Sequence, residues 1–241
     1  MIRFEVKNEN GKKEQAMHPN KKVLPAGYTL VFTAAAVVFM VLLAMDITGP
    51  FRTLFKAIPV STLLVLVICQ MSGFARICLT GALLGSVCGD VLLDQSGQNL
   101  FVFGLAAFLA GHIFYTLLFL RNAARPDNTE KLVIAGLICF AGVLMWLFSD
   151  IAPELYGPVV AYIAVIVLMS IGALLVPAPD RLLFWGALVF IASDLVLAVN
   201  KFLITIPAGR LINITLYFLA QYLIIAAARG IWTKKSALLQ V

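Results

Sequence analysis

Hydrophobic runs of about 20 residues alternate with short polar segments along almost the whole chain. As an α-helix, a run of that length crosses the roughly 30 Å hydrocarbon core of a bilayer. The fold class predicted is therefore all-α, a polytopic membrane helix bundle with eight transmembrane helices. The predicted helices cover residues 26–45, 53–70, 76–93, 99–120, 131–149, 155–176, 181–199 and 209–228.

The composition agrees with that pattern. Of the 241 residues, 62% are hydrophobic and 12% are charged, whereas a soluble domain has about 25% charged residues. We expect a basic N-terminal tail over residues 1–24, one transmembrane domain over 25–230 and a short tail over 231–241. The first run lacks a small-residue cleavage site and is too long for a signal peptide, so we expect it to be a true span.

The net charge of +6 indicates an orientation. Eight spans place both termini on one side, and 14 of the 18 Lys and Arg residues fall on that side. The other four are Arg52, Lys56, Lys201 and Arg210. The positive-inside rule places both termini in the cytoplasm, which in a bacterium means the inner membrane. We interpret the basic tail as a topology signal that contacts anionic lipid, and expect no nucleic-acid partner.

Two aspartates, Asp90 and Asp194, lie deep inside hydrophobic runs with similar surroundings. Gly81 precedes Asp90 by nine residues, and Gly186 precedes Asp194 by eight. Other echoes between the two halves are separated by 99 to 110 positions, which suggests a duplicated unit of four helices. Because four is even, this would be a parallel 4+4 repeat with its pseudo-axis along the membrane normal. Chance similarity among Leu-, Ala- and Gly-rich helices is the alternative.

A carboxylate at the centre of a bilayer costs roughly 2.5–3.5 kcal/mol on insertion scales, so both aspartates are expected to face the protein interior. They are candidates for a catalytic pair. The alternative is structural: Lys56 and Lys201 would then pair with them to hold the bundle together. Lys201 has a second alternative, since its side chain can also reach the membrane interface.

Helical spacing places further polar side chains on shared faces. Ser86, Asp90 and Asp94 recur every four residues, although Asp94 itself is expected in the outer loop. A polar stripe on the last helix cannot face lipid cheaply and is expected to face the bundle. That stripe consists of Asn213, Tyr217 and Gln221. Tyr217 and Gln221 are equally compatible with interhelical hydrogen bonding and with ligand binding, whereas Asn213 favours interhelical hydrogen bonding. Tyr156 and Tyr162 are expected to be interface-belt and packing residues.

Other chemistries have little support. The four cysteines, Cys69, Cys78, Cys88 and Cys139, form no CxxC pair and are interpreted as small hydrophobic residues. Two histidines, His18 and His112, are too few for a zinc hydrolase, which needs at least three ligands. We expect no metal or other cofactor. Hydrolase and P-loop motifs are absent, although Ser193 beside Asp194 keeps a nucleophile formally possible.

An ordered set of short segments resembles the YhhN-like lysoplasmalogenase family of multi-span membrane enzymes. The segments span residues 50–230 and no single one is specific. They are Lys56-Ala57-Ile58-Pro59, Gly89-Asp90, Gly111-His112-Ile113-Phe114-Tyr115, Ser193-Asp194, Asn200-Lys201-Phe202, and Tyr217 with Gln221-Tyr222.

The resemblance implies hydrolysis of the vinyl ether bond of lysoplasmalogens, with a lysophospholipid as partner and a fatty aldehyde as product. A vinyl ether hydrolyses by protonation at carbon, which suits one neutral and one ionised carboxyl group, as at glycosidic bonds. The catalytic candidates are Asp90 and Asp194, with the acid left unassigned. The substrate-binding candidates are Lys56, His112, Tyr115, Asn200, Lys201, Tyr217 and Gln221.

Two other functions fit buried ionisable residues in a helix bundle. A transporter or flippase would favour helices that are interrupted near mid-membrane. Pro59 and Pro158 are expected near helix ends, and no proline lies in the middle of the third, fourth, seventh or eighth predicted helix, which weakens that hypothesis. A hydrolase acting on a lipid ester or amide is the other alternative, and its product would be a fatty acid.

Overall fold

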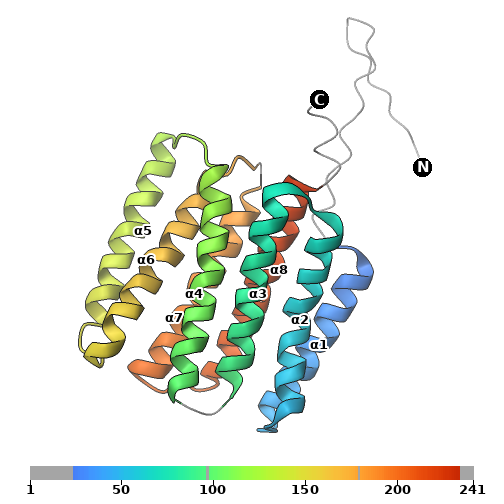
Figure 1. Cartoon of the computed structure of the whole chain (residues 1–241). Coiled ribbons are helices and arrows are strands. Elements are labelled where there is room, and N and C mark those ends of the chain that lie inside the picture. Colours follow the sequence, from blue (N-terminus) through green and yellow to red (C-terminus); the bar gives the residue numbers. More distant parts are fainter. Residues whose placement is uncertain (1–23, 96–97, 179, 234–241) are drawn as a thin grey trace, which may run out of the picture.

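A computed structural model describes residues 24–95, 98–178 and 180–233. Eight α-helices cover nearly all of these residues, and each is long and apolar enough to cross a membrane (Figure 1). They are α1 Ala26–Ala44, α2 Pro50–Gln70, α3 Gly73–Asp94, α4 Gln98–Arg121, α5 Asn128–Leu147, α6 Pro153–Leu175, α7 Leu182–Phe202 and α8 Gly209–Trp232. The eight predicted spans are confirmed, and the chain is an integral multi-pass membrane protein. The predicted tails lie almost wholly outside the described residues.

Local sequence explains several helix starts. Pro50 and Pro153 occupy the first turn of α2 and α6, where a missing N–H does no harm. Asp127 caps α5 by accepting a hydrogen bond from the Glu130 backbone, and the Glu130 side chain accepts one from Asp127 N in return. Gly49, with φ of 115°, permits the tight connection between α1 and α2.

Two helix pairs form the centre of the bundle. α3 packs along α4, and α7 packs along α8, with α1 and α2 on one flank and α5 and α6 on the other (Figure 1). Small residues allow the close approach: a Cβ on Gly85 would lie 2.7 Å from Ala107 O, and one on Gly186 would lie 3.1 Å from Ile224 N. These two contacts hold α3 against α4 and α7 against α8, and α3 and α7 are the helices that carry Asp90 and Asp194.

The outer surface is apolar, as contact with lipid requires. Leu30, Ile77, Leu132 and Trp146 are each more than 60% exposed. Polar side chains instead lie inside the bundle, and the buried Lys, Arg and Asp side chains of the described residues lie near the start of α2 and the end of α3: Arg52, Lys56, Asp90 and Asp94. Such an inside-out distribution leaves the interior as the place for chemistry.

Candidate active site

A cavity of about 390 Å³ opens between the helices near the end of the bundle that carries the α1–α2 and α7–α8 connections. All eight helices contribute to its wall. Apolar side chains, among them Phe39, Phe108, Leu144 and Ile166, form much of the lining. The polar lining residues are Lys56, Asp90, Asp94, Tyr162, Ser193, Asp194, Asn200, Lys201, Arg210, Asn213 and Tyr217. The two candidate aspartates therefore share one cavity.

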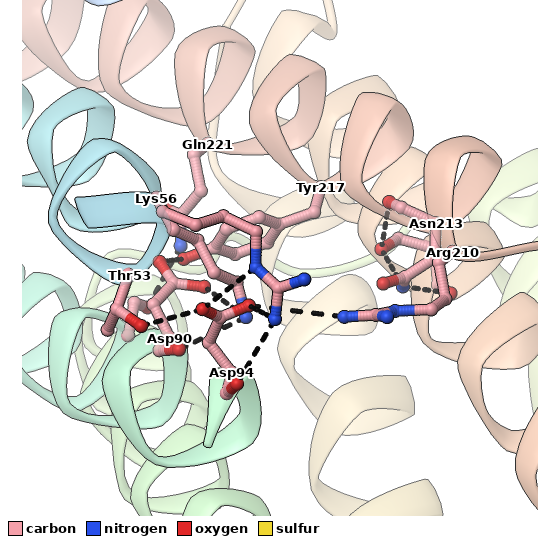
Figure 2. Close-up of polar contacts among 11 residues, drawn as sticks. Thr53, Lys56, Asp90, Asp94, Arg210, Asn213, Tyr217 and Gln221 are labelled. Atoms are coloured by element: carbon pink, nitrogen blue, oxygen red, sulfur yellow. Dashed lines mark hydrogen bonds and ion pairs between the residues drawn. The ribbon is translucent and has the colours of Figure 1, made fainter. Parts of the chain in front are cut away.

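Asp90 lies at the centre of the first cluster, and is 1% exposed (Figure 2). Tyr217 Oη of α8 donates a hydrogen bond of 2.7 Å to Asp90 Oδ2. Lys56 Nζ of α2 donates to the backbone oxygen of Asp90 at 3.1 Å and lies 3.6 Å from Asp90 Oδ1. Lys56 is buried too, so a cation and a carboxylate meet here largely out of water. The attraction between opposite charges this close opposes the cost of removing each of them from water.

Asp194 lies at the centre of the second cluster, which has a different composition. Tyr162 Oη of α6 donates to Asp194 Oδ2 at 2.7 Å, and His112 Nε2 of α4 lies 3.8 Å from the same oxygen. His112 Nδ1 is 2.7 Å from Phe108 O. Because a carbonyl oxygen only accepts, Nδ1 carries the proton, and in a neutral imidazole Nε2 is then an acceptor. Within the described residues, no Lys or Arg forms an ion pair with Asp194.

Two polar atoms of these clusters have unused hydrogen-bonding capacity. In the described part of the chain, Asp90 Oδ1 and His112 Nε2 are buried without a hydrogen-bond partner, as is Asp94 Oδ1. Such groups are rare in folded proteins, because an unpaired buried polar atom costs about 1–3 kcal/mol. Phe190 packs between the clusters, with ring centroids 4.6 Å from His112 and 5.6 Å from Tyr217.

The predicted polar stripe of α8 faces the bundle, but its members have different surroundings. Gln221 Nε2 donates to Ser86 Oγ at 2.9 Å, and Tyr115 Oη donates to Gln221 Oε1 at 2.7 Å. This chain ties α3, α4 and α8 together beyond the cavity wall. Asn213 Nδ2 donates to the backbone oxygen of Ser193 at 2.9 Å, and Ser193 Oγ donates to Asn213 O at 3.0 Å. The Ser193 hydroxyl is therefore engaged with α8 rather than with a catalytic base.

Asp94 departs from its predicted place in the outer loop. It is the last residue of α3 and is 9% exposed, because Arg52 of α2 holds it inside. Arg52 Nε donates to Asp94 Oδ2 at 3.2 Å, and Arg52 Nη2 lies 3.1 Å from Oδ1. Thr53 Oγ1 donates to Oδ2 at 2.7 Å (Figure 2). Arg210 Nη2 of α8 lies 4.0 Å from Oδ1.

The connection between α7 and α8 positions the two remaining candidates. Asn200 Oδ1 accepts a hydrogen bond of 2.9 Å from Ile206 N, so it holds the connection in place. Lys201 Nζ lies 4.8 Å from the ring centroid of Phe101, an arrangement typical of a cation–π contact. Both side chains border the cavity. Lys201 thus lies at the mouth of the cavity.

Comparison with known proteins identifies the family. Residues 51–228 match the YhhN family. The chain belongs to the YhhN family. It is 33% identical over 213 residues to the lysoplasmalogenase TMEM86B of Sus scrofa, covering 87% of both chains. It is 30% identical over 212 residues to the lysoplasmalogenase TMEM86A of Homo sapiens, covering 82% of this chain and 86% of the relative.

A bacterial relative of this YhhN-family protein gives a similar result. The lysoplasmalogenase of Mycobacterium bovis is 33% identical over 155 residues, covering 62% of this chain and 59% of the relative. No solved structure matches.

Four residues of the candidate site, Arg52, Thr53, Tyr162 and Arg210, are not among those that the sequence predicts for it. Tyr162 was expected to be a packing residue, yet its hydroxyl contacts Asp194. Arg52, Thr53 and Arg210 surround Asp94. The sequence does single out the two arginines in one respect. Together with Lys56 and Lys201, they are the only Lys and Arg residues that it assigns to the side of the membrane opposite the two termini.

Proposed function

We propose that this protein hydrolyses the vinyl ether bond of a lysoplasmalogen, releasing a fatty aldehyde and glycerophospho-ethanolamine or -choline. The observation that carries the proposal is one cavity, enclosed by the eight membrane-spanning helices and lined by two aspartates with different neighbours. Its support from outside the structure is that the YhhN-family relatives are named lysoplasmalogenases. A vinyl ether needs a proton donor and a charge-stabilising carboxylate, and the two clusters differ in the direction that this chemistry requires.

We assign Asp90 as the ionised carboxylate. Lys56 lies 3.6 Å from Oδ1, and Tyr217 donates to Oδ2, so both neighbours stabilise negative charge. Oδ1 keeps an unused acceptor position with which to hold water. Asp194, which has Tyr162 and neutral His112 as its neighbours, is assigned as the acid. His112 Nε2 is an unpaired acceptor 3.8 Å from Asp194 Oδ2, so a small rotation of a protonated Asp194 would bring its hydroxyl within hydrogen-bond distance of that nitrogen.

The reaction balances with these two groups and one water. Asp194 donates its proton to the second carbon of the alkenyl chain, and the first carbon becomes an oxocarbenium ion beside Asp90. Water adds to that carbon and gives its proton to Asp90, forming a hemiacetal. Asp90 then returns a proton to the departing glycerol oxygen while Asp194 takes the hemiacetal hydroxyl proton, which leaves the aldehyde and restores both residues.

The cavity also suits an amphiphilic substrate. Its mouth carries charged side chains, whereas apolar residues such as Ile163, Ile166 and Ile191 lie alongside the aspartates and toward mid-membrane. With both termini in the cytoplasm, as the charge distribution predicts, the cavity would open toward the outer leaflet. The helices that carry the site are continuous over their described residues, including α2 and α6. Pro59, expected near a helix end, lies well inside α2, and Pro158 lies inside α6, yet neither helix is interrupted. Continuous helices favour an enzyme over a transporter with broken helices.

The direct test is aldehyde release from lysoplasmenyl-ethanolamine by purified protein in detergent, beside Asp90→Asn and Asp194→Asn. Aldehyde from the parent, with both variants folded and at least 100-fold slower, is the expected result. Release of a fatty acid instead would mean acyl hydrolysis. Near-normal turnover by both variants would reject the carboxylate mechanism.

Reaction in D₂O tests the first step separately. Protonation at carbon places one deuterium on the second carbon of the aldehyde, and mass spectrometry of the rapidly trapped product detects it. Aldehyde without that deuterium would exclude protonation at carbon, whichever residue supplies the proton.

A further inference from the structure

The cavity carries more positive than negative charge. Three cations line it, namely Lys56, Lys201 and Arg210. Arg52 is a fourth, since it contacts the lining residue Asp94. The carboxyl groups lining the cavity in the described residues are Asp90, Asp94 and Asp194. Even with all three ionised the cations exceed them by one, and a protonated Asp194 raises the excess to two.

The four cations are not equivalent. Arg52 and Lys56 are buried, with side chains 6% and 9% exposed, and each has a carboxylate as its close partner. Because a buried ion pair is held by the low polarity of its surroundings, these two are committed to the protein. Arg210 differs, since its side chain is 59% exposed and its contact with Asp94 is a single approach of 4.0 Å. Most of the five N–H donors of its guanidinium remain available.

Asp94 explains why Arg210 extends over the cavity mouth. Its carboxylate already receives Arg52 and Thr53, so its charge is matched without Arg210 (Figure 2). Arg210 comes from the other side of the cavity, from the first turn of α8, and points at this neutralised pair. An arginine in that position is oriented by Asp94 yet keeps a free edge, which is the geometry that binds a phosphate in two-point fashion.

Spacing relates this arginine to the proposed reaction centre. Asp94 follows Asp90 by one helical turn, about 6 Å along the axis of α3. In a lysophospholipid, four single bonds of about 1.5 Å each separate the sn-1 oxygen from the phosphate oxygen on the sn-3 carbon. A substrate with its vinyl ether at Asp90 therefore has its phosphate at the level of Asp94 and Arg210.

We infer that Arg210, with Lys201 as a second cation, forms a subsite for the phosphodiester of a lysophospholipid, and that Arg210 selects phosphate-bearing over neutral ether lipids. The identity of the anion rests on the proposed function. Lys56 is not part of the subsite, because it belongs to the Asp90 cluster. The subsite determines which lipids bind, whereas the aspartates determine which bond breaks.

The first experiment measures binding without turnover. The probes are a 1-O-alkyl-glycerophosphocholine and the 1-O-alkylglycerol of the same chain length, both saturated ethers that lack the vinyl bond. Affinity is measured in mixed micelles of a neutral detergent for the parent, Arg210→Gln, Arg210→Lys and the control Arg125→Gln. Arg125 is an exposed arginine at the opposite end of the bundle, so its loss changes net charge equally.

We expect the parent and Arg125→Gln to bind the phosphate-bearing ether about 10- to 100-fold more tightly than the neutral one, as one charge-assisted contact provides. Arg210→Gln should lose most of that preference by weakening the phosphate-bearing ether alone, and Arg210→Lys should keep part of it. Equal weakening of both ethers would mean a structural role for Arg210, and an unchanged preference would mean no role; either overturns the subsite.

The second experiment follows aldehyde release from lysoplasmenyl-choline and from the phosphate-free 1-alkenylglycerol. Arg210→Gln should raise KM at least 10-fold for the first substrate, with kcat nearly unchanged, and leave the second unaffected. If the parent prefers the phosphate-bearing ether but releases no aldehyde, the proposed reaction fails and the subsite stands. If it releases aldehyde from both substrates with equal KM, the reaction stands and the subsite fails.

Discussion

Asp90 and Asp194 occupy comparable places in the two halves of the chain, 104 positions apart, but their partners differ in kind. Each carboxylate accepts one tyrosine hydroxyl at 2.7 Å. Around Asp90 the second partner is the ammonium of Lys56, whereas around Asp194 it is the imidazole of His112. Each cluster thus contains one tyrosine hydroxyl that donates to the carboxylate. The clusters differ in the second partner, which carries a fixed positive charge only beside Asp90.

The partners themselves come from corresponding helices. Lys56 of α2 and Tyr162 of α6 are 106 positions apart, and His112 of α4 and Tyr217 of α8 are 105 apart. A parallel 4+4 repeat would produce such spacing, and it stays a prediction. If it holds, a single ancestral site has diverged into a charged half and a neutral half. That divergence is what acid–base chemistry on one substrate requires, because two identical carboxyl groups would compete for the same role.

The largest expected effect tests the two aspartates against each other. Asp194→Asn removes the proposed proton donor, and we expect turnover to fall about 10³- to 10⁴-fold. Asp90→Asn leaves the donor but removes the stabilising charge, and we expect a smaller fall of about 10²- to 10³-fold. Aldehyde release under single-turnover conditions measures both.

Asp150→Asn is the matched control for these variants, because Asp150 is exposed on the loop between α5 and α6. We expect it to turn over at the parental rate. A larger loss from Asp90→Asn than from Asp194→Asn would invert the assignment of acid and carboxylate.

How far the sequence alone leads depends on the kind of residue. The apolar runs are unambiguous, because a buried backbone in lipid must be helical. Asp90 and Asp194 could be selected because a carboxylate within a membrane-spanning helix has a high free energy unless it faces the protein interior. Lys201 and Asp94 lie at helix ends, where a charged side chain is equally stable in a cavity, in a loop and at the membrane interface. Their positions depend on tertiary neighbours, Phe101 for Lys201 and Arg52 for Asp94.

Tyr162 shows a different limit. The ring of a tyrosine in an apolar helix packs against neighbouring side chains, and its hydroxyl bonds to any acceptor within reach. The surrounding sequence is therefore the same whether or not the hydroxyl contacts a catalytic group. Only the approach of α6 to α7 brings its hydroxyl to Asp194. The alternation of spans in the sequence assigns Arg210 to the same side of the bundle as Lys56 and Lys201, yet nothing in the chain pattern relates it to Asp94 in the preceding half.

The ion pair between Lys56 and Asp90 leads to a prediction about stability. Lys56→Met removes the cation from a buried pair, which leaves Asp90 uncompensated and should lower the free energy of unfolding by about 3–5 kcal/mol. Thermal unfolding in detergent measures the loss. The double variant Lys56→Met with Asp90→Asn should recover much of it, because no buried charge remains. If the loss in the double variant equalled the sum of the losses in Lys56→Met and Asp90→Asn, the two side chains would not interact.

Removing the same hydroxyl group from Tyr162 or from Tyr217 compares the two clusters directly. Tyr162→Phe removes the one side-chain hydrogen bond that Asp194 makes among the described residues, and we expect kcat to fall about 10- to 100-fold. Tyr217→Phe should have a smaller effect, about 3- to 10-fold, because Lys56 still holds the Asp90 carboxylate. Steady-state kinetics with both purified variants measures the ratio. A greater loss from Tyr217→Phe would show that the hydroxyl, rather than the cation, is the main partner of Asp90.

The smallest expected effect concerns the connection that supports the neutral half. Asn213→Ala deletes hydrogen bonds from α8 to Ser193, the residue directly before Asp194. Hydrogen bonds between membrane helices contribute about 0.6 kcal/mol on average, so unfolding should become easier by about 1 kcal/mol. Turnover should stay within about threefold of the parent, since the tight packing of α7 against α8 at Gly186 still positions Asp194. A loss of turnover comparable with that of Tyr162→Phe, at nearly unchanged stability, would make Asn213 a member of the reaction centre and extend the neutral half beyond Tyr162 and His112.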